Sequence, residues 1–227
     1  MPPAVTPFRI VIPLYPAVDL MDVAAPREIF SWMAESWSAA GPVEVLLAAE
    51  SDDPVPTRDG TRILPDVTFD AVPSVDVIWV PGAGLDGLQA AMADEYLLET
   101  LRGWAQQARW VTSVCEGALV LASAGLLDGY QATTHWAFLP CLCQFEGITV
   151  IGGDGDFPRF VVDPGTGGGA VRVTGAGISA GLDEALQLVQ MIAGDSVAES
   201  VQQTIQYYPD PPVSAPLPVP GTCPLSS

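Results

Sequence analysis

Short apolar stretches alternate along the chain with longer stretches whose apolar residues recur at helical spacing. The strand-like stretches are Phe8–Leu14, Val43–Ala49, Val75–Val80, Trp110–Val114 and Val171–Thr174. The helical stretches are Pro26–Ala40, Asp94–Ala108, Cys115 to about Ala124, Trp136–Phe145, Gly181–Ala193 and Val197–Tyr207. This order predicts an α/β protein with a mostly parallel sheet covered by helices on both faces.

Two segments depart from this alternation. Residues 52–69 are polar and rich in turn formers, and Asp59-Gly60 before Thr61–Leu64 indicates a hairpin. Pro209–Pro224 contains too many prolines for a helix or a central strand, so we expect an extended, loosely packed terminus. Since 227 residues suit one hydrophobic core, we expect one domain over residues 1–208 and a proline-rich tail over 209–227.

Three predicted strands end in loops that carry candidate functional residues. The first leads into the loop through Asp22, the second into the Pro81–Gly84 turn, and the third directly into Cys115. Because parallel strands carry their ligands beyond their carboxyl ends, these three loops are candidates for one shared site.

The charge of the chain narrows the chemistry. The sequence has 27 acidic residues, eight arginines and no lysine, for a net charge of −19. A missing lysine excludes Schiff-base chemistry and the phosphate-binding P-loop. Strong negative charge disfavours nucleic acids and anionic membrane surfaces, so we expect a small-molecule partner. No run of apolar residues is long enough to span a membrane, and residues 1–7 lack the basic region and apolar run of a signal peptide. We therefore expect a cytoplasmic location.

The four cysteines, at positions 115, 141, 143 and 223, do not have the spacing of a disulfide framework, and free thiols are predicted. His135 is the single histidine, so a structural zinc site, which draws on four Cys or His ligands, is not expected. No metal is predicted, and acid–base chemistry falls to carboxylates.

Cys115 lies between an apolar strand and the small residues that follow Glu116. A strand-to-helix turn of this kind is a nucleophile elbow, in which helix N–H groups lower the pKa of the thiol. The alternative is a buried, inert cysteine, the commoner state of a free cysteine. The position between strand and helix favours the reactive thiol.

The run from Val111 to Leu139, VTSVCEGALVLASAGLLDGYQATTHWAFL, resembles the nucleophile segment of the ThiJ/PfpI superfamily. Its AGLLDGYQATTHW portion is most similar to isonitrile (isocyanide) hydratases, and also resembles the sensor domains of AraC-type regulators. LYPAVDLMDVAAPREIF, VDVIWVPGAG and TGAGISAGLDEAL extend the resemblance over residues 8 to about 208. It implies a flavodoxin-like three-layer sandwich related to class I glutamine amidotransferases, and a homodimer.

The resemblance also implies roles for single residues. Cys115 matches the nucleophile, and Asp22 the acid that hydrogen-bonds it; Asp19 is the rival, expected in a solvated loop, and Asp22 could instead cap a helix. Isonitrile hydration of this kind needs no cofactor. The thiolate attacks the terminal carbon of R–N≡C, and Asp22 supplies a proton to that carbon. Water then adds to the resulting thioimidate, and an N-substituted formamide leaves. Backbone N–H groups at Gly82, Ala83 and Glu116 are the expected oxyanion donors.

Two positions depart from the hydratases. Glu116 stands where they carry threonine, and Ala83 where the turn usually has a second glycine. Glu116 could act as a second acid or base, or raise the pKa of the thiol by charge repulsion. Unlike the histidine in the Cys-His pair of the family's peptidase branch, His135 does not follow Cys115 directly, so we interpret it as a structural or interface residue. Trp136 is a candidate pocket residue. The alternatives to a hydratase are a cysteine-based redox or ligand sensor and another cysteine-dependent hydrolase or lyase.

Overall fold

The computed structural model describes residues 6–37, 41–153 and 155–226. Its central sheet has the strand order β10-β11-β7-β6-β1-β2-β5. All neighbouring strands run parallel except β10, which is antiparallel to β11. The strands are β1 Phe8–Pro13, β2 Val43–Ala49, β5 Val67–Thr68, β6 Val77–Val80, β7 Trp110–Ser113, β10 Phe160–Asp163 and β11 Val171–Gly175. The predicted parallel α/β sheet is confirmed.

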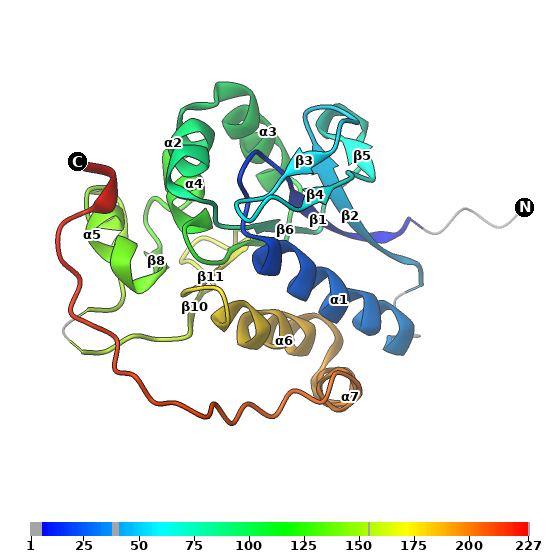
Figure 1. Cartoon of the computed structure of the whole chain (residues 1–227). Helices are drawn as coiled ribbons and strands as arrows, with labels where there is room; N and C mark the ends of the chain where they lie inside the picture. Colours follow the sequence, from blue (N-terminus) through cyan, green and yellow to red (C-terminus); the bar gives the residue numbers. More distant parts are fainter. Residues whose placement is uncertain (1–5, 38–40, 154, 227) are drawn as a thin grey trace, which may run out of the picture.

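Helices cover both faces of this sheet (Figure 1). One layer contains α1 Leu20–Ser36, α6 Ala180–Ala193 and α7 Asp195–Thr204, and the other contains α2 Leu85–Ala93, α3 Glu95–Ala105 and α4 Gly117–Ser123. The strands between the layers are apolar and almost fully buried at their centres, as expected for a sheet covered on both sides. The result is the predicted three-layer sandwich.

Smaller elements lie beyond the sheet. β3 Val55–Pro56 and β4 Arg62–Ile63 form an antiparallel hairpin, and Gly60 in its turn has a φ of 88°, which confirms the hairpin predicted from Asp59-Gly60. β8 Gln131–Ala132 pairs with β9 Thr149–Val150, next to the short helix α5 Leu139–Leu142. Single-turn helices occupy Phe69–Ala71, Trp136–Phe138 and Pro224–Ser226.

The predicted start of the first helix is wrong. α1 begins at Leu20, six residues before the predicted start at Pro26, and it ends at Ser36; the predicted end at residue 40 lies outside the described residues. Pro26 lies inside this helix, where it has no N–H to donate to the Asp22 carbonyl oxygen one turn earlier. The indole Nε1 of Trp79 donates to that oxygen at 2.9 Å. A tertiary contact therefore satisfies the group that proline leaves open, and the helix continues through it.

The prediction of four free thiols is also wrong. Cys141 and Cys223 form a disulfide with a Cα–Cα distance of 4.7 Å, while Cys115 and Cys143 are free. The proline-rich tail is extended as predicted, but its end is not loosely packed. Cys223 is buried, and the tail crosses from α7 to α5 along one edge of the molecule (Figure 1). The two half-cystines are 82 residues apart, so only the folded chain brings them together.

None of the helices in the described part of the chain combines the length and apolar composition that a bilayer-spanning helix needs.

Candidate active site

Cys115 lies at the turn between β7 and α4, as predicted. Its φ of 55° is in the left-handed region, which costs free energy for a residue other than glycine and is maintained by surrounding bonds. Its N–H donates to the Ala176 carbonyl oxygen at 2.9 Å, and its own carbonyl oxygen accepts from Oγ1 of Thr134 at 2.7 Å. The side chain is buried at the carboxyl end of the sheet. The structure thus has the strained strand-to-helix geometry of an elbow.

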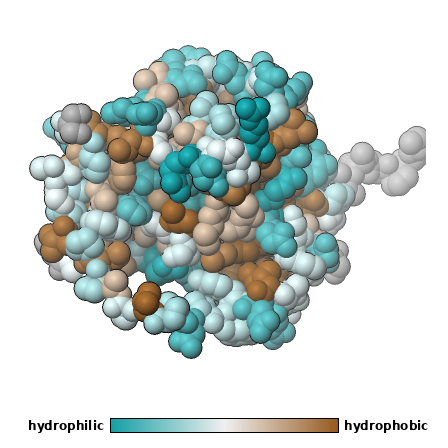
Figure 2. Space-filling view, in the orientation of Figure 1, coloured by the Kyte–Doolittle hydropathy of each residue, from teal (hydrophilic) through white to brown (hydrophobic). Residues whose placement is uncertain are grey.

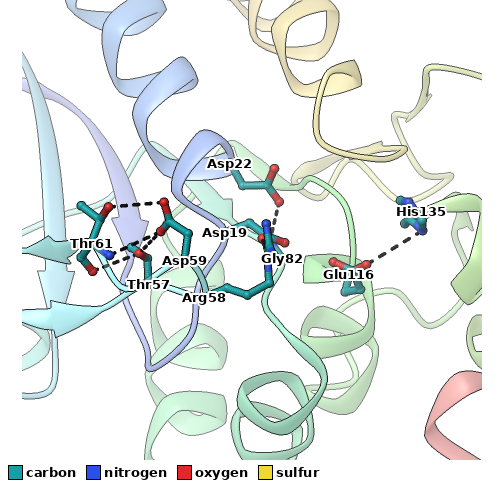
Figure 3. Close-up of polar contacts among 9 residues, drawn as sticks. All are labelled: Asp19, Asp22, Thr57, Arg58, Asp59, Thr61, Gly82, Glu116 and His135. Carbon is teal, nitrogen blue, oxygen red and sulfur yellow. Dashed lines mark hydrogen bonds and ion pairs between the residues drawn. The ribbon is translucent and has the colours of Figure 1, made fainter.

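Asp22 reaches the same place from the first turn of α1. Its Oδ2 accepts the Gly82 N–H at 2.9 Å, and its Oδ1 has no hydrogen-bond partner although it is buried (Figure 3). The capping alternative for Asp22 is wrong, because the helix begins at Leu20 and Asp19 occupies the cap position. The Gly82 N–H, predicted as an oxyanion donor, is used here to hold the Asp22 carboxyl. Ala83 is buried and pairs with Val18 in an isolated β-bridge.

Three side chains converge on Gly82. A Cβ atom built at this glycine would lie 2.5 Å from Oε2 of Glu116, 2.8 Å from Cβ of Cys115 and 3.0 Å from Oδ2 of Asp22. Such distances are too short for any side chain, so the absence of one at position 82 is what lets the groups approach. The three strand-end loops predicted to meet do meet here.

Asp19 and Arg58 complete the polar surroundings. Asp19 was expected in a solvated loop, but it is buried and forms an ion pair with Nε of Arg58 from the β3–β4 hairpin (Figure 3). One potential ligand atom each of Asp19, Asp22 and Cys115 lies within 4.8 Å of the others, close enough to contact one metal ion. Each carboxylate already has a partner of its own: Asp19 is paired with the Arg58 guanidinium, and Asp22 accepts the Gly82 N–H.

Burial dominates the electrostatics of the site. Burial raises the pKa of Asp22 from 3.8 to about 8. The hydrogen bond from the Gly82 N–H lowers this pKa, whereas the charges of Asp19 and Glu116 raise it further. Burial likewise raises the pKa of Glu116 to about 7, while contact with the Cys115 thiol lowers it. At neutral pH Asp22 is therefore mostly a neutral carboxylic acid, and Glu116 is close to its midpoint.

The pKa of the Cys115 thiol is raised well above its ordinary value, first by burial and then by the charges of Glu116 and Asp22. The backbone N–H of Ile178, which hydrogen-bonds the thiol, lowers it but does not prevail. The expectation that the elbow lowers the pKa of this thiol is wrong, because desolvation and two carboxyls outweigh the N–H groups of a seven-residue helix. Glu116 raises the pKa of the thiol, as predicted from charge repulsion.

His135 and Trp136 line a cavity of about 340 Å³ beside the elbow. Nδ1 of His135 lies 3.9 Å from Oε1 of Glu116 (Figure 3). The same nitrogen accepts the Ala137 N–H at 3.3 Å. Burial lowers the pKa of His135, so the ring is neutral at pH 7 and its contact with Glu116 is not an ion pair there. The prediction that Trp136 lines a pocket is confirmed, and His135 lines the same cavity.

Three contacts of the site were not among the residues predicted from the sequence. Arg58 comes from a hairpin, Ile178 from the loop before α6, and Tyr15 from the loop after β1, where its hydroxyl donates to the Pro81 carbonyl oxygen. Tyr15 and Ile178 do follow the carboxyl ends of β1 and β11, which is the position that singled out the other loops, whereas Arg58 does not.

A family model described as the DJ-1/PfpI family matches residues 8–189, four-fifths of the chain. The chain belongs to the DJ-1/PfpI family. The ThiJ/PfpI resemblance inferred from the Cys115 segment is thereby confirmed, together with its fold.

Relatives of this chain include both an enzyme and a transcriptional regulator. An isonitrile hydratase from Pseudomonas putida is 38% identical over 199 residues, covering 88% of this chain and 78% of the relative. The transcriptional regulator GbdR from Pseudomonas aeruginosa is 31% identical over 66% of this chain, but that match covers only 37% of the regulator. The crystal structure of a ThiJ/PfpI family protein from Pseudomonas syringae has a TM-score of 0.80 and 34% identity, covering 94% of this chain and 80% of that one.

Proposed function

We propose that this protein hydrates an isocyanide to an N-substituted formamide, with Cys115 as nucleophile and Asp22 as proton donor and acceptor. The observation that carries the proposal is a buried pair of groups. The Cys115 thiol and the Asp22 carboxyl lie within 4.8 Å of each other, and Asp22 keeps its proton at neutral pH. The 38% identity to an isonitrile hydratase supports the choice of substrate class.

The protonation state of Asp22 suits this chemistry. The terminal carbon of R–N≡C carries a lone pair, so it needs a proton donor as well as a sulfur nucleophile. A carboxyl whose pKa is near 8 retains its proton at pH 7 and can still give it up, as general acid catalysis requires. An ordinary surface aspartate, with a pKa near 4, would already be ionised.

In the first step the Asp22 proton moves to the terminal carbon, the Cys115 sulfur bonds to the same carbon, and the thiol proton passes to the Asp22 carboxylate. The product is the thioimidate Cys115–S–CH=N–R. This exchange needs no preformed thiolate, which agrees with the raised pKa of the thiol.

In the second step the oxygen of a water molecule bonds to the thioimidate carbon, and a proton reaches the nitrogen through Asp22. The C–S bond then breaks as the hydroxyl becomes a carbonyl, and its proton returns to sulfur. The sum is R–N≡C plus water giving R–NH–CHO, with the thiol restored and no cofactor consumed.

Glu116 favours a second candidate, a cysteine-dependent hydrolase or lyase of other substrate specificity. Its carboxyl lies beside Cys115 and Asp22 with a pKa of about 7, so it can supply a second acid or base where the hydratases resembling this chain carry threonine. The redox-sensor alternative has less support. Sensor thiols are exposed and have low pKa values, whereas Cys115 is buried and its pKa is raised.

The test is incubation of the purified protein with an alkyl or aryl isocyanide and detection of the N-formamide by NMR. Cys115→Ala and Asp22→Asn should abolish turnover, and Cys143→Ser, which changes the exposed free cysteine, should not. Turnover that survives in Cys115→Ala contradicts the mechanism. If the wild type is inactive and Glu116→Thr is active, the second candidate gains support. Homodimerisation, which the family resemblance implies, is measured separately by sedimentation.

A further inference from the structure

The cavity beside the elbow has the size and lining of a small-ligand site. Its volume of about 340 Å³ falls in the range of about 300–1,000 Å³ typical of small-molecule pockets. Apolar side chains form much of its wall, among them Trp136, Leu139, Phe157, Pro158, Ile178 and Leu217. Arg159 also lines it, but its guanidinium is already bonded to Oδ2 of Asp183 at 2.6 Å. The lining therefore favours an uncharged, apolar group.

Hydrogen bonds connect this cavity to Cys115. Thr134, which lines it, donates its hydroxyl to the Cys115 carbonyl oxygen at 2.7 Å, and Ala176, also in the lining, accepts the Cys115 N–H at 2.9 Å. Ile178 contributes both to the wall and to the thiol through its backbone N–H. A group bound in the cavity is thus adjacent to the elbow from which the sulfur would attack.

One wall belongs to the proline-rich tail. Leu217 lines the cavity from a segment without helix or strand, and 48% of its surface is exposed. Six residues later, Cys223 is joined by a disulfide to Cys141 in α5, the same short helix that contributes Leu139 to the lining. Figure 2 shows hydrophobic side chains on the lower edge of the molecule, where Figure 1 places the tail.

We propose that this cavity binds an apolar N-substituent of the isocyanide, and that Leu217, held in place by the Cys141–Cys223 disulfide, determines a preference for bulky substituents. The inference rests on the proposed function, since the occupant is the R group of R–N≡C. A partly exposed leucine beside a cavity gains burial when an apolar ring fills it. A methyl substituent is too small to reach such a wall.

The test compares kcat/KM for cyclohexyl isocyanide and methyl isocyanide. The ratio of the two should fall about tenfold in Leu217→Ala, the usual scale for losing a few apolar carbons from a specificity pocket. It should fall in the same direction in Cys223→Ser, where the tail is no longer fastened. Val219→Ala is the matched control, because Val219 lies on the same tail, is 72% exposed and does not line the cavity. Its ratio should equal that of the wild type.

An unchanged ratio in both Leu217→Ala and Cys223→Ser, with both substrates still turned over, overturns the inference and leaves the proposed function standing. If the wild type hydrates neither isocyanide, the proposed function fails, and the cavity is tested by binding of N-cyclohexylformamide in isothermal titration calorimetry. Binding to the wild type that weakens about tenfold in Leu217→Ala supports the cavity and its tail wall. Equal affinity in both proteins, or no binding to the wild type, overturns them.

Discussion

Trp79 donates its indole N–H to the backbone carbonyl oxygen of Asp22, at 2.9 Å. This is the oxygen that would accept from residue 26 in an ordinary helix, and Pro26 has no N–H to give. Trp79 is fully buried on β6, and its ring packs edge-on against Phe30 of α1 at 5.6 Å. The sheet therefore fixes the turn of α1 that carries the candidate proton donor.

Trp79→Phe should lower kcat more than it changes KM, because an unsatisfied Asp22 backbone carbonyl loosens the carboxyl that donates the proton in the proposed mechanism. A buried polar group without a partner also costs about 1–3 kcal/mol of stability. Trp104→Phe is the matched control: Trp104 is a buried tryptophan of α3, on the other side of the sheet, packed against Phe69. Steady-state kinetics and urea unfolding distinguish the two variants. Equal kcat values in Trp79→Phe and the wild type contradict the positioning role.

Gly82→Ala should abolish turnover and destabilise the protein by about 1–3 kcal/mol, as overpacking of a filled site does. The added carbon meets Glu116, Cys115 and Asp22 at once, within 3.0 Å. Gly103→Ala is the control, since a Cβ there has nothing within 4 Å and alanine favours the interior of α3. That variant should be fully active and slightly more stable. Thermal unfolding and formamide production measure both effects.

Stability should fall as pH rises from about 4 to about 8. The pKa of Asp22 is higher in the folded protein than in the unfolded chain, so the folded state binds more protons in that window and loses stability as they leave. Glu116 contributes with the same sign up to about pH 7, and so does Glu184, whose buried carboxyl has a pKa raised well above its ordinary value. Each group can contribute a slope of up to about 1.4 kcal/mol per pH unit.

Urea unfolding at pH 5, 6, 7 and 8 checks this pH dependence. Asp22→Asn removes one titrating group while keeping the shape of the side chain, so its slope should be shallower than that of the wild type. Asp86→Asn, at an exposed position in the first turn of α2, should leave the slope unchanged. Identical slopes in Asp22→Asn and the wild type would show that Asp22 is ionised in the folded protein.

The unfolded, unreduced protein should expose two thiols to Ellman's reagent, those of Cys115 and Cys143, and four after reduction. In the folded protein only Cys143 should react quickly, because Cys115 is buried. Four thiols without reduction would mean that Cys141 and Cys223 are not joined, in which case the end of the tail has no covalent attachment.

Local patterns in the sequence were enough to predict the sandwich and the meeting of three loops. Apolar strands such as Val75–Val80 and Trp110–Val114 can be buried only in a sheet covered on both faces, and their carboxyl ends then lie at one edge. For this reason the sequence alone predicts that Cys115, Asp22 and Gly82 lie together, and the motif around Cys115 indicates the family.

Only the tertiary structure decided the protonation states of the site residues and the long-range contacts that surround them. The pKa of Cys115 depends on burial and on carboxyls from distant segments, and these outweigh the local helix effect that the sequence suggested. Arg58 reaches Asp19 across 39 residues, and Cys223 reaches Cys141 across 82. Desolvation and long-range pairing are properties of the packed chain, so no stretch of sequence a few residues long contains them.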